Sequence, residues 1–114
     1  MIQRLYGFAG KMYRHMRPVR NPHYRKFLRR FACVGCKSET RYRDAMHVGP
    51  RGLAQKASDL DALPGCRQCH RQLHRIGPVH FQSCHKVDFA QMQEMFRAFY
   101  LIEFPERAEG EKAA

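Results

Sequence analysis

The sequence predicts a small α+β domain held together by a zinc ion. Three observations carry this prediction. The chain has 114 residues, one domain's length, and 44% of them are hydrophobic, so the core can only be modest. Two Cys-x-x-Cys pairs bracket a segment whose composition is typical of strands. Stretches with apolar residues at helical spacing lie on both sides of that segment.

The first helix is predicted over residues 22–32. Asn21 is a favourable N-cap, and Pro22 suits the first helical position. Four apolar side chains at helical spacing should pack into the core: Tyr24, Phe27, Leu28 and Phe31. The opposite side, which includes Arg25 and Arg29, is then available to phosphates.

The segment between the cysteine pairs should form two strands. Residues 39–48 contain Thr, Tyr and Val and predict the first strand, which Gly49 and Pro50 end. We expect an irregular loop over 49–60 and a short return strand over 61–65.

Two further helices are predicted. One opens at the second cysteine pair and runs to about Arg75, where Gly77 and Pro78 should end it. The other starts at Asp88, with Gln91 as its capping-box partner. Its apolar face should pack in the core, with a homodimer contact as the alternative: Phe89, Met92, Phe96 and Phe99. The predicted organisation is a basic arm over 1–20, a domain over 21–104 and a charged tail over 105–114.

The charge is concentrated at the front of the chain. Residues 1–43 hold 12 Lys and Arg against the single acid Glu39, and residues 44–114 hold nine of each sign, within a net charge of +11. Such a block predicts a polyanionic partner, with nucleic acid first and DNA foremost; the alternative is a basic face that only confers solubility. No apolar run is long enough for a membrane helix, and the start of the chain has no signal-peptide pattern. We therefore expect a cytoplasmic protein without a membrane partner.

The cysteine pairs predict a structural zinc site. Cys33 with Cys36, and Cys66 with Cys69, have the two-residue spacing that lets each pair hold one ion. Cys84 is left over and is predicted to be a free buried thiol. Residues 66–70 also match the c-type haem attachment pattern, which would need export and would leave the first pair without a role.

Three histidines predict chemistry beyond the zinc site. His70 and His74 are four residues apart on the predicted helix, so both imidazoles can hold one metal ion. The four-cysteine shell has no room for them, which indicates a second ion. His47 ends the predicted first strand beside the loop, where an imidazole suits a general base. A surface histidine without a function is the alternative for His47.

The order of these motifs resembles the HNH endonuclease family, which has the ββα-metal fold. The resemblance spans about residues 21–80 and is closest to small bacterial and prophage members, with the phage recombination-enhancement nucleases as similar proteins. Three segments carry it: RNPHYRKFLRRFACVGC, DAMHV and GLAQKASDLDALPGCRQCHRQLHRIG. It implies a treble-clef-like domain and a bacterial or phage-encoded protein.

The resemblance also implies roles. His47 matches the general base, His70 and His74 match the ligands of a catalytic divalent cation (Mg²⁺, Mn²⁺ or Zn²⁺), and Asp61 stands where the family usually has Asn. His47 would take a proton from the water that attacks phosphorus, leaving 5′-phosphate and 3′-hydroxyl ends. Two loop residues could clamp flanking phosphates: Arg51 and Lys56.

Two positions depart from the family pattern. Met46 stands where many members have a metal ligand, and Asp44, on the same strand face, is the expected substitute. Asp61 in place of Asn can accept a hydrogen bond from the imidazole. The rival hypothesis is a non-catalytic DNA-binding or recombination-accessory protein, which Met46 favours. A zinc-stabilised protein-interaction module is a third hypothesis, and it leaves the basic front of the chain unexplained.

Overall fold

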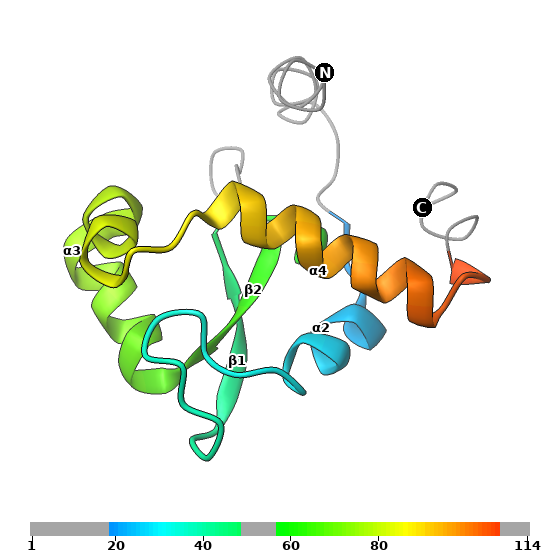
Figure 1. Cartoon of the computed structure of the whole chain (residues 1–114), viewed down its shortest axis with the longest axis horizontal. Helices are drawn as coiled ribbons and strands as arrows, with labels where there is room; N and C mark the ends of the chain where they lie inside the picture. Colours follow the sequence, from blue (N-terminus) through cyan, green and yellow to red (C-terminus); the bar gives the residue numbers. More distant parts are fainter. Residues whose placement is uncertain (1–18, 49–56, 108–114) are drawn as a thin grey trace.

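A computed structural model describes residues 19–48 and 57–107. Its elements follow the order α2 (Pro22–Leu28), β1 (Arg43–His47), the 3-10 turn η1 (Asp59–Asp61), β2 (Ala62–Cys66), α3 (Arg67–His85) and α4 (Phe89–Glu103). In Figure 1 the two strands lie between α3 and α2, and α4 runs across them. The described part is therefore α+β, as predicted. Arg51, Lys56 and nearly all of the basic arm lie outside the described residues, as does the end of the tail.

The strands β1 and β2 form an antiparallel two-stranded sheet. The register places Asp44 opposite Gly65 and His47 opposite Ala62. The first strand is shorter than the predicted 39–48, and the return strand begins one residue later than predicted, because Asp61 still belongs to η1. This register puts His47 at the C-terminal end of β1.

Helix α2 begins as predicted but ends at Leu28 rather than residue 32. The Asn21 side chain accepts a hydrogen bond from the Tyr24 amide, which caps the helix start. At the other end, Arg43 from β1 donates to the carbonyl oxygens of Phe31 at 2.8 Å and Arg29 at 3.2 Å. The strand thus satisfies carbonyls that further helix would have used, and the chain turns away toward the first cysteine pair.

Helix α3 extends well beyond the predicted end near Arg75. The predicted break is present, because Gly77 adopts φ 84° and interrupts the helical geometry. Pro78 then occupies the first position of a second helical stretch, which proline tolerates, and this stretch runs to His85. It buries Phe81 and leaves Cys84 exposed, so the prediction of a buried Cys84 thiol is wrong.

Helix α4 starts at the predicted N-cap, where the Asp88 carboxylate accepts from the Gln91 amide. Its buried face differs from the prediction, because Phe99 is 45% exposed and Met92 is half-buried. The buried side chains recur at helical spacing: Phe89, Gln93, Phe96 and Tyr100. This face closes the core against α2 and the sheet. No helix in the described ranges combines the length and the apolar character that crossing a membrane requires.

Candidate metal centre and histidine site

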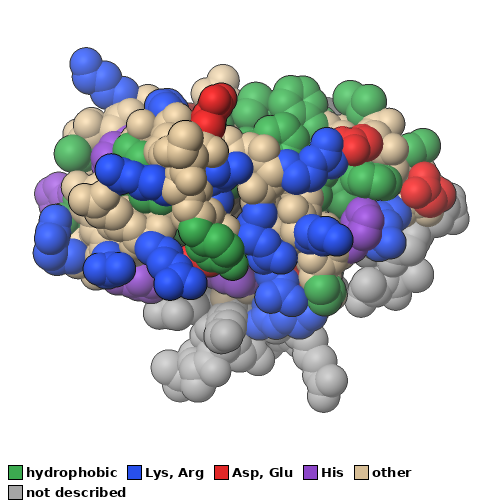
Figure 2. Space-filling view, turned by 90° about the horizontal axis from the view of Figure 1, so that it is seen from below, with side chains coloured by type: hydrophobic (Ala, Val, Ile, Leu, Met, Phe, Trp, Pro, Cys, Tyr) green, Lys and Arg blue, Asp and Glu red, His purple; other side chains and the backbone are tan. Residues whose placement is uncertain are grey.

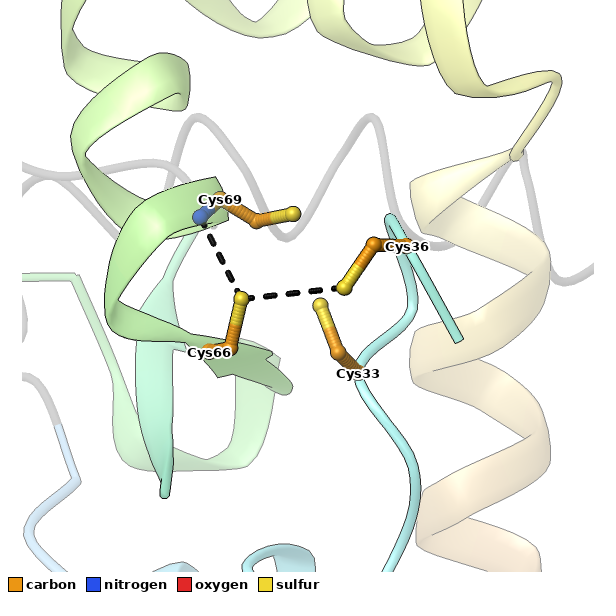
Figure 3. A group of neighbouring side chains, drawn as sticks. All are labelled: Cys33, Cys36, Cys66 and Cys69. Carbon is orange, nitrogen blue, oxygen red and sulfur yellow. Dashed lines mark hydrogen bonds between the residues drawn. The ribbon is translucent and has the colours of Figure 1, made fainter. Parts of the chain in front are cut away.

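The two cysteine pairs converge on one point (Figure 3). The Sγ atoms of Cys33, Cys36, Cys66 and Cys69 all lie within 4.8 Å of one another. The Sγ atoms of Cys36 and Cys66 are 3.7 Å apart. A Zn–S bond of about 2.3 Å in a tetrahedron requires sulfur atoms roughly 3.8 Å apart. The four thiols therefore fit a metal ion such as zinc, which they could hold.

Local backbone features bring the two pairs together. Cys33 and Cys36 lie in a turn closed by a hydrogen bond from the Lys37 amide to the Cys33 carbonyl, with Lys37 at φ 64°. Cys66 ends β2 and caps α3, its Sγ accepting from the Cys69 amide at 3.4 Å. A Cβ at Gly35 would lie 2.9 Å from the Cys69 Sγ, so glycine lets the two turns approach.

The thiols differ in acidity. Burial tends to raise the pKa of Cys66, but hydrogen bonds from the Cys69 amide, neighbouring thiols and Arg41 outweigh burial and lower it to about 7. Burial and the adjacent Cys33 thiol raise the pKa of Cys69. Because a metal binds thiolates, the lowered pKa of Cys66 favours the form of this side chain that binds a metal.

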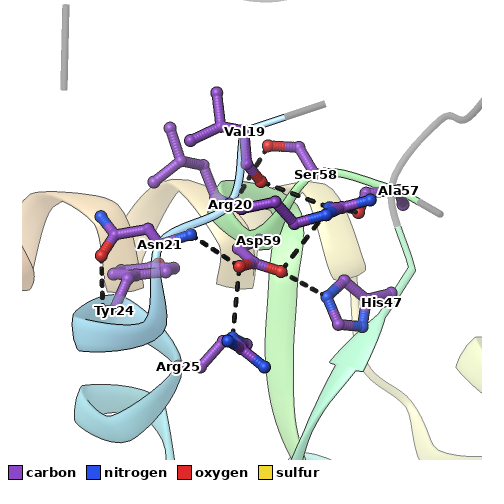
Figure 4. Close-up of polar contacts among 10 residues, drawn as sticks. Val19, Arg20, Asn21, Tyr24, Arg25, His47, Ala57, Ser58 and Asp59 are labelled. Atoms are coloured by element: carbon purple, nitrogen blue, oxygen red, sulfur yellow. Dashed lines mark hydrogen bonds and ion pairs between the residues drawn. The ribbon is translucent and has the colours of Figure 1, made fainter. Parts of the chain in front are cut away.

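His47 contacts a buried carboxylate at the end of β1. Its Nε2 lies 2.6 Å from Oδ1 of Asp59, a residue of η1 that is 1% exposed (Figure 4). The His47 side chain itself is 27% exposed. A carboxylate on Nε2 fixes the proton there and leaves Nδ1 as the nitrogen that can accept a proton. The pair therefore has the geometry of an oriented general base.

The Asp59 carboxylate is held from several sides (Figure 4). Its Oδ2 accepts from the Asn21 amide at 2.7 Å and lies 3.2 Å from the Arg25 Nε. The Arg20 guanidinium is 3.8 Å from Oδ1. Burial tends to raise the pKa of Asp59, but hydrogen bonds from His47 and the Asn21 amide and the charges of His47 and Arg25 hold it below its usual range. Asp59 thus stays ionised. Arg25, which was predicted to be available to phosphates, forms an ion pair with this carboxylate.

Asp61 lies elsewhere. Its Oδ1 accepts from the Arg97 guanidinium at 2.8 Å, and its backbone carbonyl accepts from the side-chain amide (Nε2) of Gln93 at 2.8 Å. Burial raises the pKa of Asp61, while Arg97 acts to lower it. The predicted contact of Asp61 with His47 is thus made by Asp59 instead, because Asp61 is drawn toward α4. In the sequence, residues 58–61 (Ser-Asp-Leu-Asp) indicate that an acid lies near His47, but they do not indicate whether it is Asp59 or Asp61.

The proposed ligands of a second ion are only loosely gathered. The Asp44 Oδ2 is 3.8 Å from the His70 Nδ1, and the His70 and His74 rings stack with centroids 4.9 Å apart. Burial and the nearby His74 lower the pKa of His70, which favours the neutral imidazole, the form that binds a metal. Among the described residues, the cysteines are the one set of three or more such ligands drawn tightly together. Met46 is fully buried over Gly65, where an added Cβ would lie 2.2 Å from its sulfur.

Neither a curated protein nor a solved structure matches this chain. One family model matches residues 12–100, which is more than half of the chain. The chain therefore belongs to the family described as "Protein of unknown function (DUF968)".

Proposed function

We propose that this protein is a metal-dependent, HNH-type endonuclease that hydrolyses phosphodiester bonds in DNA. The observation that carries the proposal is the His47–Asp59 pair, 2.6 Å apart at the end of β1. An imidazole oriented by a buried carboxylate is the arrangement that general-base catalysis requires. A protein that only binds DNA has no need of it.

In the proposed reaction, His47 accepts a proton from water through Nδ1. The water oxygen attacks the phosphorus in line, the bond to the 3′ oxygen breaks, and the leaving 3′ oxygen takes a proton from solvent water, so the products carry 5′-phosphate and 3′-hydroxyl ends. Asp59 keeps the ring in the required tautomer and stabilises the imidazolium that forms. A divalent cation bound by Asp44, His70 and His74 would supply stabilisation of the charge that develops on the phosphate oxygens.

The charge distribution supports nucleic acid as the substrate class. The chain carries a net charge of +11, with the excess in residues 1–43. Figure 2 shows Lys and Arg side chains spread over one face of the molecule, with histidines among them. Such a face attracts a polyanion, and its binding should weaken steeply with added salt.

A second candidate function is a zinc-stabilised DNA-binding or recombination-accessory protein without catalytic activity. Two observations favour it. Met46 is fully buried rather than available as a ligand, and the side chains of Asp44, His70 and His74 are not drawn tightly together. In that case the zinc site and the basic face would be sufficient for the function.

A nicking assay separates the two candidates. Supercoiled plasmid is incubated with the protein and Mg²⁺ or Mn²⁺, and the same is done with His47→Ala and with His80→Ala, which alters an exposed histidine outside the site. The nuclease proposal expects nicking by wild type and His80→Ala only, with DNA binding retained by His47→Ala. Binding without cleavage under either ion would favour the accessory protein. Equal nicking by His47→Ala would exclude His47 as the base.

A further inference from the structure

The structure contains a cavity that the proposed reaction does not use. It has a volume of about 440 Å³, which is within the range of ligand-binding pockets, and it lies against Cys36 and Cys69 of the cysteine cluster. Its other lining side chains are all polar or charged: Arg41, Gln68, Arg71, Gln72, Arg75 and His85. No Asp or Glu of residues 19–48 and 57–107 lines it. We propose that this cavity binds phosphate groups of a nucleic-acid strand.

The glutamines contribute donors to the cavity. The Gln68 Oε1 accepts a hydrogen bond from the Arg41 guanidinium, and the Gln72 Oε1 lies 2.6 Å from the Nε2 of His85. Because an arginine can only donate, the amide oxygen of Gln68 must face Arg41. With their oxygens engaged, neither glutamine's side-chain N–H group has a hydrogen-bond partner among the described residues, so both can donate to a ligand. A cavity of guanidinium and amide donors suits an anion with several oxygens.

Two arginines are not committed within the described part of the chain. Arg71 and Arg75 are exposed and four residues apart on α3, and neither pairs with a carboxylate of the described residues. Arg41 differs, because its guanidinium donates to the Oε1 of Gln68 and contributes to the lowered pKa of Cys66. The capacity to bind phosphate therefore rests on Arg71 and Arg75, with the glutamines beside them.

The cavity is separate from the histidine site. The cavity residues of α3 at 68, 71, 72 and 75 recur with helical spacing on one face, while His70 and His74 lie on another. These faces are nearly opposite, so a strand engaged at the histidines would have to pass around the helix to make a second contact at the cavity. Phosphate contacts position a strand without reading its sequence. The proposal rests on the proposed nucleic-acid substrate but not on cleavage.

The test measures binding of a labelled DNA oligonucleotide by fluorescence anisotropy at several salt concentrations, with no Mg²⁺ or Mn²⁺ added. The variant R71Q/R75Q is compared with K86Q/R107Q, which removes the same charge from side chains that do not line the cavity and lie outside the basic front of the chain. We expect R71Q/R75Q to bind about tenfold more weakly or worse, and its salt slope to fall by about 2. The control pair should change affinity far less.

Equal losses in the two double variants would overturn the proposal, since only net charge would then matter. A fall in zinc content of R71Q/R75Q alone would also overturn it, because the arginines would then serve the thiolates. If the wild type binds inorganic phosphate but the two double variants have equal DNA affinity, the ligand of the cavity is a small anion and the proposal is wrong. Failure of cleavage is a distinct result. If the wild type binds DNA through Arg71 and Arg75 but does not cut it, the phosphate-binding cavity is supported and the nuclease proposal is wrong.

Discussion

The Nε2 atom of His47 lies 2.6 Å from Oδ1 of Asp59, a carboxylate buried between α2, β1 and η1. The two residues are 12 positions apart in the sequence, and η1 lies at the end of β1. The same carboxylate accepts from the Asn21 amide, which ties the start of α2 to the site. One buried acid therefore links the fold to the proposed base.

Replacing Asp59 by Asn should reduce cleavage by on the order of 10²-fold or more, because the imidazole loses the anion that fixes its tautomer. The measurement is the rate of plasmid nicking and its pH profile. Glu94→Gln, which alters an exposed acid on α4, is the control and should cut like wild type. If Asp59 had only a structural role, folded Asp59→Asn protein would show the same pH profile of nicking as wild type.

The same carboxylate should make stability depend on pH. The pKa of Asp59 is lower in the folded chain than its ordinary 3.8. Its contribution is therefore fully present above pH 3.8 and is lost as the pH falls through the folded value. We expect Asp59→Asn to lower the free energy of unfolding by about 1–3 kcal/mol at pH 7. In urea unfolding, the difference in the free energy of unfolding between wild type and Asp59→Asn should become smaller at acid pH. A difference that does not depend on pH would contradict this prediction.

Asp61 should behave in the opposite way to Asp59 in the cleavage assay. Asp61→Ala removes the charged partner of Arg97 and should lower the free energy of unfolding by about 1–3 kcal/mol. Cleavage measured well below the melting temperature should persist, because Asp61 does not contact His47. Loss of cleavage in a fully folded Asp61→Ala protein would contradict this prediction and show that cleavage depends on Asp61.

Removing the metal should destabilise the domain. A chelator or Cys36→Ser should lower the melting temperature and broaden the transition, because the four thiols join the turn after α2 to the junction of β2 and α3. Cobalt substitution gives a second measurement through thiolate absorbance. Cys84→Ser is the matched control, since Cys84 is exposed and outside the cluster. Equal melting temperatures for Cys36→Ser and Cys84→Ser would mean that the cysteine cluster binds no ion.

The local features of the fold could be predicted from the sequence because they depend on residues a few positions apart. Asn21 and Asp88 cap helices through amides three residues on, and Gly77 interrupts α3 where a break was predicted. The spacing within each cysteine pair likewise predicted that the pairs belong together. Arg51 and Lys56 remain predictions, since they lie outside the described residues.

The early end of α2 depends on a contact that local rules do not contain. Arg43 reaches back from β1 to carbonyls 12 and 14 residues earlier, which replaces the last turn of the predicted helix. The second half of α3 was missed for a related reason. Pro78 can start a helix as well as end one, and burial of Phe81 in the core decides between the two.

Residue spacing alone therefore established an α+β chain with a four-cysteine cluster and a histidine at a strand end. Only packing decided that Asp59 serves His47 while Asp61 turns to Arg97, and that the arginines and glutamines of α3 meet Arg41 around one cavity. The physical reason is distance along the chain. Capping and periodicity act within about one turn, whereas a buried carboxylate takes whichever donors the folded elements bring to it.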